Sequence, residues 1–66
     1  MREGKVKWYN EVKGYGFIQD ENGEEIFVHR TGIDKSTPRL ETGQKVNYDT
    51  KEGDKGIIAI NVKVIE

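Results

Sequence analysis

The sequence predicts an all-β fold, a small five-stranded antiparallel Greek-key barrel, and three observations support this prediction. Apolar and polar residues alternate in five short runs, and turn signals separate these runs. No stretch of useful length has the periodicity of an amphipathic helix. A long connection follows the third run, which suits a Greek key, and closing the sheet into a barrel also removes exposed edges.

The first three runs predict a meander of strands at residues 5–10, 15–20 and 25–29. The segment Val12-Lys13-Gly14 makes the first connection. The second contains Asn22-Gly23, which signals a type I′ hairpin because both central residues of that turn must tolerate a positive φ.

Two further strands are predicted at residues 44–51 and 57–65, with residues 53–56 joining them. Alternation in the first of these turns Val46, Tyr48 and Thr50 inward. The resulting predicted core consists of Val6, Ile18, Ile26, Val28, Ile33, Val46, Tyr48, Ile58, Ile60, Val62 and Val64.

Aromatic residues occupy an unusual place in the second and third strands, Lys13-Gly14-Tyr15-Gly16-Phe17-Ile18 and Ile26-Phe27-Val28-His29. The period of two sends the aliphatic residues to one face and the rings to the other. The second face of a half-buried strand is normally polar, so rings that are shown to water require a reason. Stacking of unpaired nucleobases supplies one, because each stacked base contributes roughly 1 to 3 kcal/mol.

Trp8 would extend this ring surface from the preceding strand, but strict alternation puts it on the face of Val6. We therefore expect a bulge or a strong twist near Lys7. Lys5, Lys7 and Lys13 lie among the rings, where ammonium groups would follow a phosphate backbone. Any single aromatic is more often simply core. Four rings and a histidine in this arrangement favour a binding surface instead.

These segments resemble a known family, the cold-shock domain of bacterial cold-shock proteins and eukaryotic Y-box proteins. Lys13-Gly14-Tyr15-Gly16-Phe17-Ile18 is similar to the first RNA-binding motif of that family, and Ile26-Phe27-Val28-His29 is similar to the second. The likeness extends to residues 4–10 and 52–62, so it covers essentially the whole chain. It implies one cold-shock domain at residues 1–66 with an OB-type barrel. It also implies a binder of single-stranded RNA and DNA with low sequence specificity, acting as an RNA chaperone that influences transcription and translation.

The resemblance also implies which residues bind nucleic acid. Trp8, Phe17, Phe27 and His29 would stack on bases, and Tyr15 would add a ring with an edge hydroxyl. Lys7 and Lys13 would lie near phosphates. Further candidates are less distinctive: Asn10 and Glu25 suit base edges, a turn or solvent equally well, and Lys55 lies in a turn where it is more simply solvated.

The loop at residues 30–43 departs from the bacterial pattern. Bacterial members commonly place an aromatic directly after the histidine of the second motif and another within the loop. This chain has Arg30 at the first place and no ring around Thr37-Pro38-Arg39, which is closer to the Y-box form. The guanidinium of Arg30 would stack on a base and reach a phosphate, or would simply face solvent.

Net charge is the one global property that argues against nucleic-acid binding. The chain has 11 Lys and Arg residues and 12 Asp and Glu residues, a net charge of −1, whereas a protein that binds phosphates is usually basic. The distribution weakens this objection. Glu21, Glu24 and Glu25 cluster at one turn, whereas residues 30–40 carry a net charge of +2. We therefore expect binding to depend mainly on stacking, with a modest salt dependence.

The remaining composition narrows the function classes. The chain has no cysteine and one histidine, so we expect no disulfide, metal site or cofactor. The sequence contains no recognisable pair of acid and base residues, so we expect neither an enzyme nor a small-molecule substrate. The amino terminus lacks a signal-peptide pattern and no apolar run could span a membrane, which predicts a cytoplasmic protein that is expected to be a monomer. The alternative function is a small β-barrel that binds peptides through its aromatic face.

Overall fold

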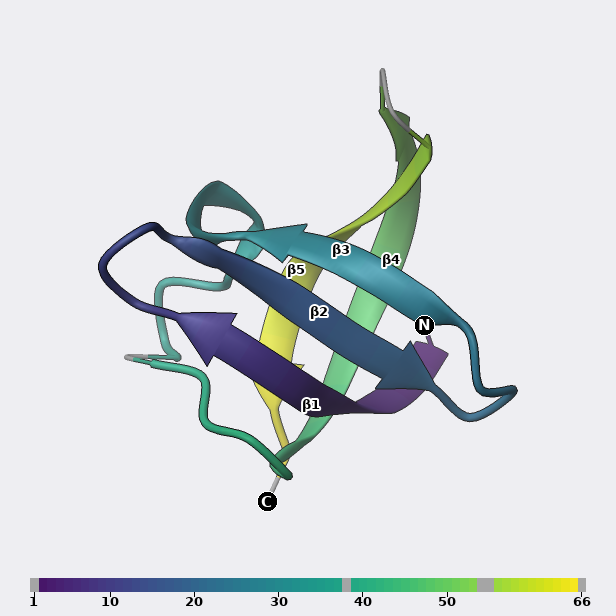
Figure 1. Ribbon diagram of the computed structural model, residues 1–66, viewed down its shortest axis with the longest axis horizontal. Helices are drawn as coiled ribbons and strands as arrows, with labels where there is room; N and C mark the ends of the chain where they lie inside the picture. Colours follow the sequence, from purple (N-terminus) through teal and green to yellow (C-terminus); the bar gives the residue numbers. More distant parts are fainter. Residues whose placement is uncertain (1, 38, 54–55, 66) are drawn as a thin grey trace.

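The computed structural model describes residues 2–37, 39–53 and 56–65, and its five strands form a closed barrel in the order β1-β2-β3-β5-β4 (Figure 1). The elements are β1 (Arg2–Asn10), β2 (Tyr15–Asp20), β3 (Glu25–His29), a 3-10 turn η1 (Arg30–Gly32), β4 (Lys45–Gly53) and β5 (Gly56–Val64). Figure 1 shows β1, β2 and β3 side by side, with β4 and β5 crossing behind them. The predicted all-β Greek-key barrel is confirmed.

One pairing in the barrel is parallel, between β3 and β5, and the other four are antiparallel. Strand directions cannot alternate all the way round a closed ring of five strands, so one parallel neighbour is a geometric necessity. The long connection after β3 allows this pairing, because it carries the chain across the barrel before β4 and β5 form their hairpin.

The bounds of β2 and β3 agree with the sequence prediction, whereas β1 starts three residues earlier than expected. Arg2 to Lys5 pair with residues 45–48 of β4, and this contact closes the barrel. The extension of β1 therefore depends on a partner more than forty residues away in sequence, which local alternation does not encode.

The predicted bulge in β1 is present at Lys7. Val6 pairs with Ile18 and Trp8 pairs with Phe17, so one extra residue lies between two consecutive pairs of the β1–β2 ladder. Because a bulge places two residues opposite one, it shifts the alternation of side chains. Val6 consequently points into the core and is 2% exposed, while Trp8 points outward and is 39% exposed.

The core agrees with the prediction for most positions. Seven predicted residues are buried: Val6, Ile18, Ile26, Val28, Val46, Tyr48 and Val62. Ile33 and Val64 are partly buried and pack against them. Leu40 and Ala59 are buried core residues that the prediction missed.

The prediction was wrong for Ile58 and Ile60, which are only half-buried, because Ala59 points inward in their place. The ladder of β4 and β5 contains a second irregularity between Asn47 and Asp49, and Asn61 opposite it has a φ of 53°. The inward residues Ala59 and Val62 are therefore three positions apart instead of two or four. Uninterrupted alternation counted back from Val62 places Ile60 and Ile58 inward, which is the wrong face for both.

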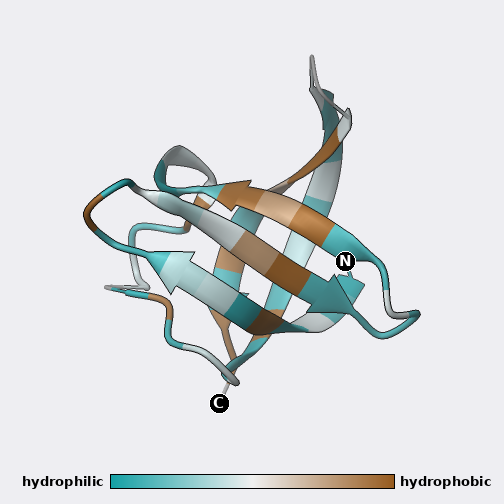
Figure 2. Ribbon diagram, viewed as in Figure 1, coloured by the Kyte–Doolittle hydropathy of each residue, from teal (hydrophilic) through white to brown (hydrophobic). Residues whose placement is uncertain are grey.

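The predicted type I′ turn between β2 and β3 is also wrong. Gly23 has a φ of 88°, but Asn22 is not in the left-handed region. The N–H of Gly23 donates to the carbonyl of Asp20 at 2.8 Å, and the N–H of Asp20 donates to the carbonyl of Glu24 at 2.8 Å. These bonds enclose a three-residue connection with glycine at its left-handed position, the next most common hairpin form. This connection is hydrophilic and faces solvent (Figure 2).

The long connection between η1 and β4 is anchored to the barrel at both ends. The N–H of Asp34 donates to the carbonyl of Val62 at 2.8 Å, and Leu40 inserts its side chain into the core. Near β4, the N–H of Gly43 donates to the carbonyl of Val6 at 2.8 Å. The loop is thus held against the end of β1 that carries Trp8 and Tyr9.

Candidate nucleic-acid interface

Three rows of side chains cross the outer face of β1, β2 and β3. The central row contains Trp8, Phe17 and Phe27, which are Cα partners in the two ladders. A second row contains Asn10, Tyr15 and His29, and a third contains Lys5, Gln19 and Glu25. The rows follow from the register and from alternation, since Gly16, Ile18, Ile26 and Val28 between them are buried.

We use the name ring surface for Trp8, Tyr15, Phe17 and Phe27, together with His29. The ring centroids of Trp8 and Phe17 are 5.5 Å apart, and those of Phe17 and Phe27 are 5.8 Å apart. Tyr15 lies 5.8 Å from Trp8 and 5.9 Å from Phe27. Each of these four rings therefore lies against two of the others at favourable separations, which supports their orientation.

Gly16 allows β2 to lie close to β1 beneath these rings. A Cβ atom built on Gly16 would overlap the carbonyl oxygen of Trp8 and lie 2.7 Å from the Cα of Tyr9. Any side chain at this position would push the two strands apart. The glycine between Tyr15 and Phe17 is therefore a structural requirement of the ring surface.

His29 ends β3 and is oriented by the turn that follows it. Its Nδ1 accepts a hydrogen bond from the N–H of Thr31 at 3.2 Å and lies 2.9 Å from the Thr31 hydroxyl oxygen. Because Nδ1 accepts the backbone bond, the hydrogen-bond network assigns the proton of the neutral ring to Nε2. The imidazole thus presents a donor as well as a flat face.

The lysines predicted to contact phosphate differ in their partners. The Nζ of Lys7 forms an ion pair with Glu25 at 2.5 Å, so the structure brings together two candidates that were expected to act separately. Lys13 is exposed in the β1–β2 connection, where its backbone N–H donates to the Oδ1 of Asn10 at 3.0 Å. The Asn10 side chain therefore serves the turn. Lys55 lies outside the described residues.

Arg30 does not lie among the rings. Its backbone N–H donates to the carbonyl of Gly14 at 2.8 Å, and its Cδ would be 3.0 Å from a Cβ on Gly14. Burial raises the pKa of the Tyr9 hydroxyl, and the positive charge of Arg30 partly opposes this rise. Arg30 and Tyr9 also line one shared hollow, so the guanidinium lies near Tyr9 and packs against Gly14.

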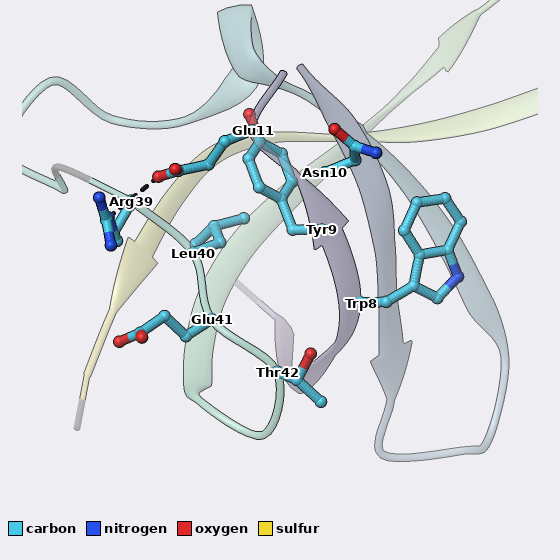
Figure 3. Close-up of a pocket in the computed structure, with 8 residues that line it drawn as sticks. All are labelled: Trp8, Tyr9, Asn10, Glu11, Arg39, Leu40, Glu41 and Thr42. Carbon is cyan, nitrogen blue, oxygen red and sulfur yellow. Dashed lines mark ion pairs between the residues drawn. The ribbon is translucent and has the colours of Figure 1, made fainter. Parts of the chain in front are cut away.

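A hollow of about 540 Å³ lies between the end of β1 and residues 39–42 (Figure 3). Tyr9 and Leu40 line its middle, and Trp8 points away from the loop at its edge. The Nε of Arg39 forms an ion pair with Glu11 at 2.9 Å, which ties the loop to the β1–β2 connection. The sequence prediction did not include Tyr9 or this ion pair. Tyr9 directly follows the outward Trp8, and this position on the opposite face was the signal that could have identified it.

The described residues contain no group of three or more His, Cys, Asp or Glu side chains that could hold a metal ion. No helix in the part of the chain that the structure describes is long and apolar enough to cross a membrane.

Comparisons with known proteins agree with this geometry. The family model described as the 'Cold-shock' DNA-binding domain matches residues 2–65. The chain is 48% identical over 63 residues to a major cold shock protein of Streptococcus pyogenes serotype M6, covering 94% of each chain. It is 45% identical over 64 residues to cold shock protein CspC of Bacillus subtilis, covering 96% of this chain and 97% of that one.

A solved structure, drosophila Unr CSD456, shares the fold with a TM-score of 0.78 at 20% identity. The match covers 98% of this chain and 26% of that one. The matches to the family model and to the bacterial relatives extend over nearly the whole chain. This protein therefore belongs to the cold-shock domain family and is a nucleic-acid-binding protein.

Proposed function

We propose that the protein binds unpaired RNA and DNA strands through its ring surface, with low sequence specificity. The observation that carries this proposal is the contiguous cluster of Trp8, Tyr15, Phe17 and Phe27 on the outer face, where a strand usually presents polar side chains. Paired bases hide their faces within the duplex stack. Only a strand with free bases can therefore use the rings without first melting.

Low specificity follows from the kind of contact that the surface offers. Every base has a π-face, so a stacking platform accepts any of them. Polar side chains at the edges of this platform that suit a base edge include Asn10, Glu25 and His29. The Oδ1 of Asn10 already accepts a bond in a turn and the carboxylate of Glu25 forms an ion pair, whereas the bonds of His29 to Thr31 involve only Nδ1. We therefore expect Nε2 of His29 to donate to a base edge.

We further propose that the protein acts as an RNA chaperone in the cytoplasm and works as a monomer. A ligand that binds only the open form of a hairpin shifts the equilibrium toward that form by mass action. Such a shift requires no catalytic step. It would influence transcription and translation wherever a hairpin controls them.

The experiment is a titration of the full chain with a short oligothymidine while the fluorescence of Trp8, its one tryptophan, is recorded. Stacking should quench the indole, and a hairpin with a stable stem should bind far more weakly than the same strand when it cannot pair. Equal affinity for the stem and the open strand would contradict the stacking model. Quenching by a proline-rich peptide but not by the oligothymidine would establish the peptide-binding alternative.

A further inference from the structure

The central row of the ring surface continues past β3. Phe27 is the Cα partner of Ile58 in the parallel pairing of β3 and β5, and Ile58 is the partner of Lys51 in the hairpin of β4 and β5. One row therefore crosses all five strands and contains Trp8, Phe17, Phe27, Ile58 and Lys51.

The neighbouring row shows that these side chains point outward. Val28 pairs with Ala59, and Ala59 pairs with Thr50. Val28 and Ala59 are both buried in the core. Because successive residues of a strand face opposite sides, Phe27, Ile58 and Lys51 share the outer face.

Ile58 is a half-buried apolar residue at an outward position, where the barrel core does not need it. A Cβ atom on Gly53 would lie 3.4 Å from the Cγ2 of Ile58. Because Gly53 has no side chain, it does not itself cover Ile58. Lys51 is exposed and has no ion-pair or hydrogen-bond partner among the described residues.

We propose that Ile58 and Lys51 form an additional nucleotide position at the β5 end of the ring surface. The apolar side chain of Ile58 would cover the face of one more unpaired base, and the ammonium group of Lys51 would neutralise the adjacent phosphate. This inference rests on the proposed function, because the strand reaches Ile58 only if it crosses Phe17 and Phe27 first.

Two features favour a nucleic-acid strand as the occupant of this position. The apolar position directly continues a row of rings, so a strand already stacked there reaches it by following the same row around the barrel. The row also ends at Lys51, whose ammonium group has no ion-pair partner among the described residues and suits a phosphate. Neighbouring strands lie about 4.8 Å apart, so Lys51 is about two strand spacings beyond Phe27 and within reach of the next nucleotide.

The test compares oligothymidines of increasing length, bound to the full chain and to four variants. Lys51→Gln should leave the affinity for the shortest binding strands unchanged. For longer strands it should lower the affinity severalfold and reduce the dependence of log K on log salt by about 0.7. Ile58→Ser should weaken the same longer strands without changing the salt dependence. Lys45→Gln is the matched control, because it removes the same charge from the other end of β4.

Identical binding by the wild type, Lys51→Gln and Ile58→Ser at every length would overturn the additional position. Equal losses in Lys51→Gln and Lys45→Gln would overturn it as well, since they would indicate a general charge effect. Phe17→Ala separates this inference from the proposed function. If Phe17→Ala binds as tightly as the wild type, the ring surface itself is not the interface. If only Phe17→Ala weakens binding, the ring surface stands and its extension falls.

Discussion

The ammonium group of Lys7 and the carboxylate of Glu25 meet at 2.5 Å on the outer face, so that β1 is joined to β3 across β2. The bulge that turns Trp8 outward is centred on the same lysine. Both side chains are nearly half exposed, at 44% and 49%. Exposed ion pairs contribute at most about 1 kcal/mol, so a phosphate can compete with Glu25 for this cation.

We expect Glu25→Gln to strengthen binding of single strands. Lys7 would lose its partner within the protein, and the affinity should rise by about 0.2 to 1 kcal/mol, the usual contribution of an exposed pair. The dependence of log K on log salt should steepen by about 0.7 if Lys7 then contacts a phosphate. Titrations at several salt concentrations measure both quantities.

Glu24→Gln is the control for this prediction, because it removes the same charge from the preceding residue, whose side chain forms no ion pair among the described residues. If the two variants behave alike, the effect comes from the net charge of the turn and not from Lys7.

Truncation of the rings should separate binding from folding. Phe17→Ala and Phe27→Ala should each weaken binding of an oligothymidine by roughly 1 to 3 kcal/mol, because each removes a stacking surface. Ile18→Ala should instead lower the free energy of unfolding by about 2 to 5 kcal/mol, because it leaves a cavity in the core. Fluorescence titration and denaturant unfolding of the same variants give the two rankings, and the reverse order would contradict the assignment of the two faces.

Arg30 lies beside Tyr9 in the free protein, and its part in binding remains a prediction. If it neutralises a phosphate, Arg30→Phe should keep the affinity while reducing the salt dependence by about 0.7. Arg30→Glu should weaken binding, most strongly at low salt where repulsion is least screened. Affinities and salt slopes that match the wild type in both variants would place Arg30 outside the interface.

The pH dependence of stability should reveal the buried hydroxyl of Tyr48. Burial, with a smaller effect of the Asp20 carboxylate, raises the pKa of Tyr48 to about 12. The pKa of a tyrosine in the unfolded chain is about 10, so the unfolded chain loses this proton first. The contribution of Tyr48 to stability is therefore complete below about pH 10 and is lost as the pH rises toward 12.

Thermal unfolding of the wild type and of Tyr48→Phe across this pH range is the measurement. The phenylalanine variant should lose less stability on going to alkaline pH, because it has no proton to release at this position. Tyr15→Phe, which changes an outward ring, should lose as much as the wild type. Parallel pH profiles for all three proteins would show that Tyr48 does not contribute.

Local sequence determined the part of the candidate interface that lies on β2 and β3. Alternation within each strand is sufficient to place Tyr15, Phe17, Phe27 and His29 on one face, since it depends only on consecutive residues. The same rule placed Trp8 on the face of Val6 and away from the other rings, and this conflict predicted the bulge at Lys7. Short connections between β1, β2 and β3 then left little freedom in how these strands pair.

The tertiary structure alone decided the features that depend on pairing between distant parts of the chain. The parallel pairing of β3 with β5 places Ile58 beside Phe27, and the irregularity near Asn61 turns Ala59 inward. The partner of Lys7 and the position of Arg30 were decided in the same way. Alternation specifies which residues share a face only until a ladder slips by one residue. The slip at Lys7 left a local signal in Trp8, whereas the slip in the ladder of β4 and β5 left none, because residues 57–62 of β5 are all aliphatic except Asn61.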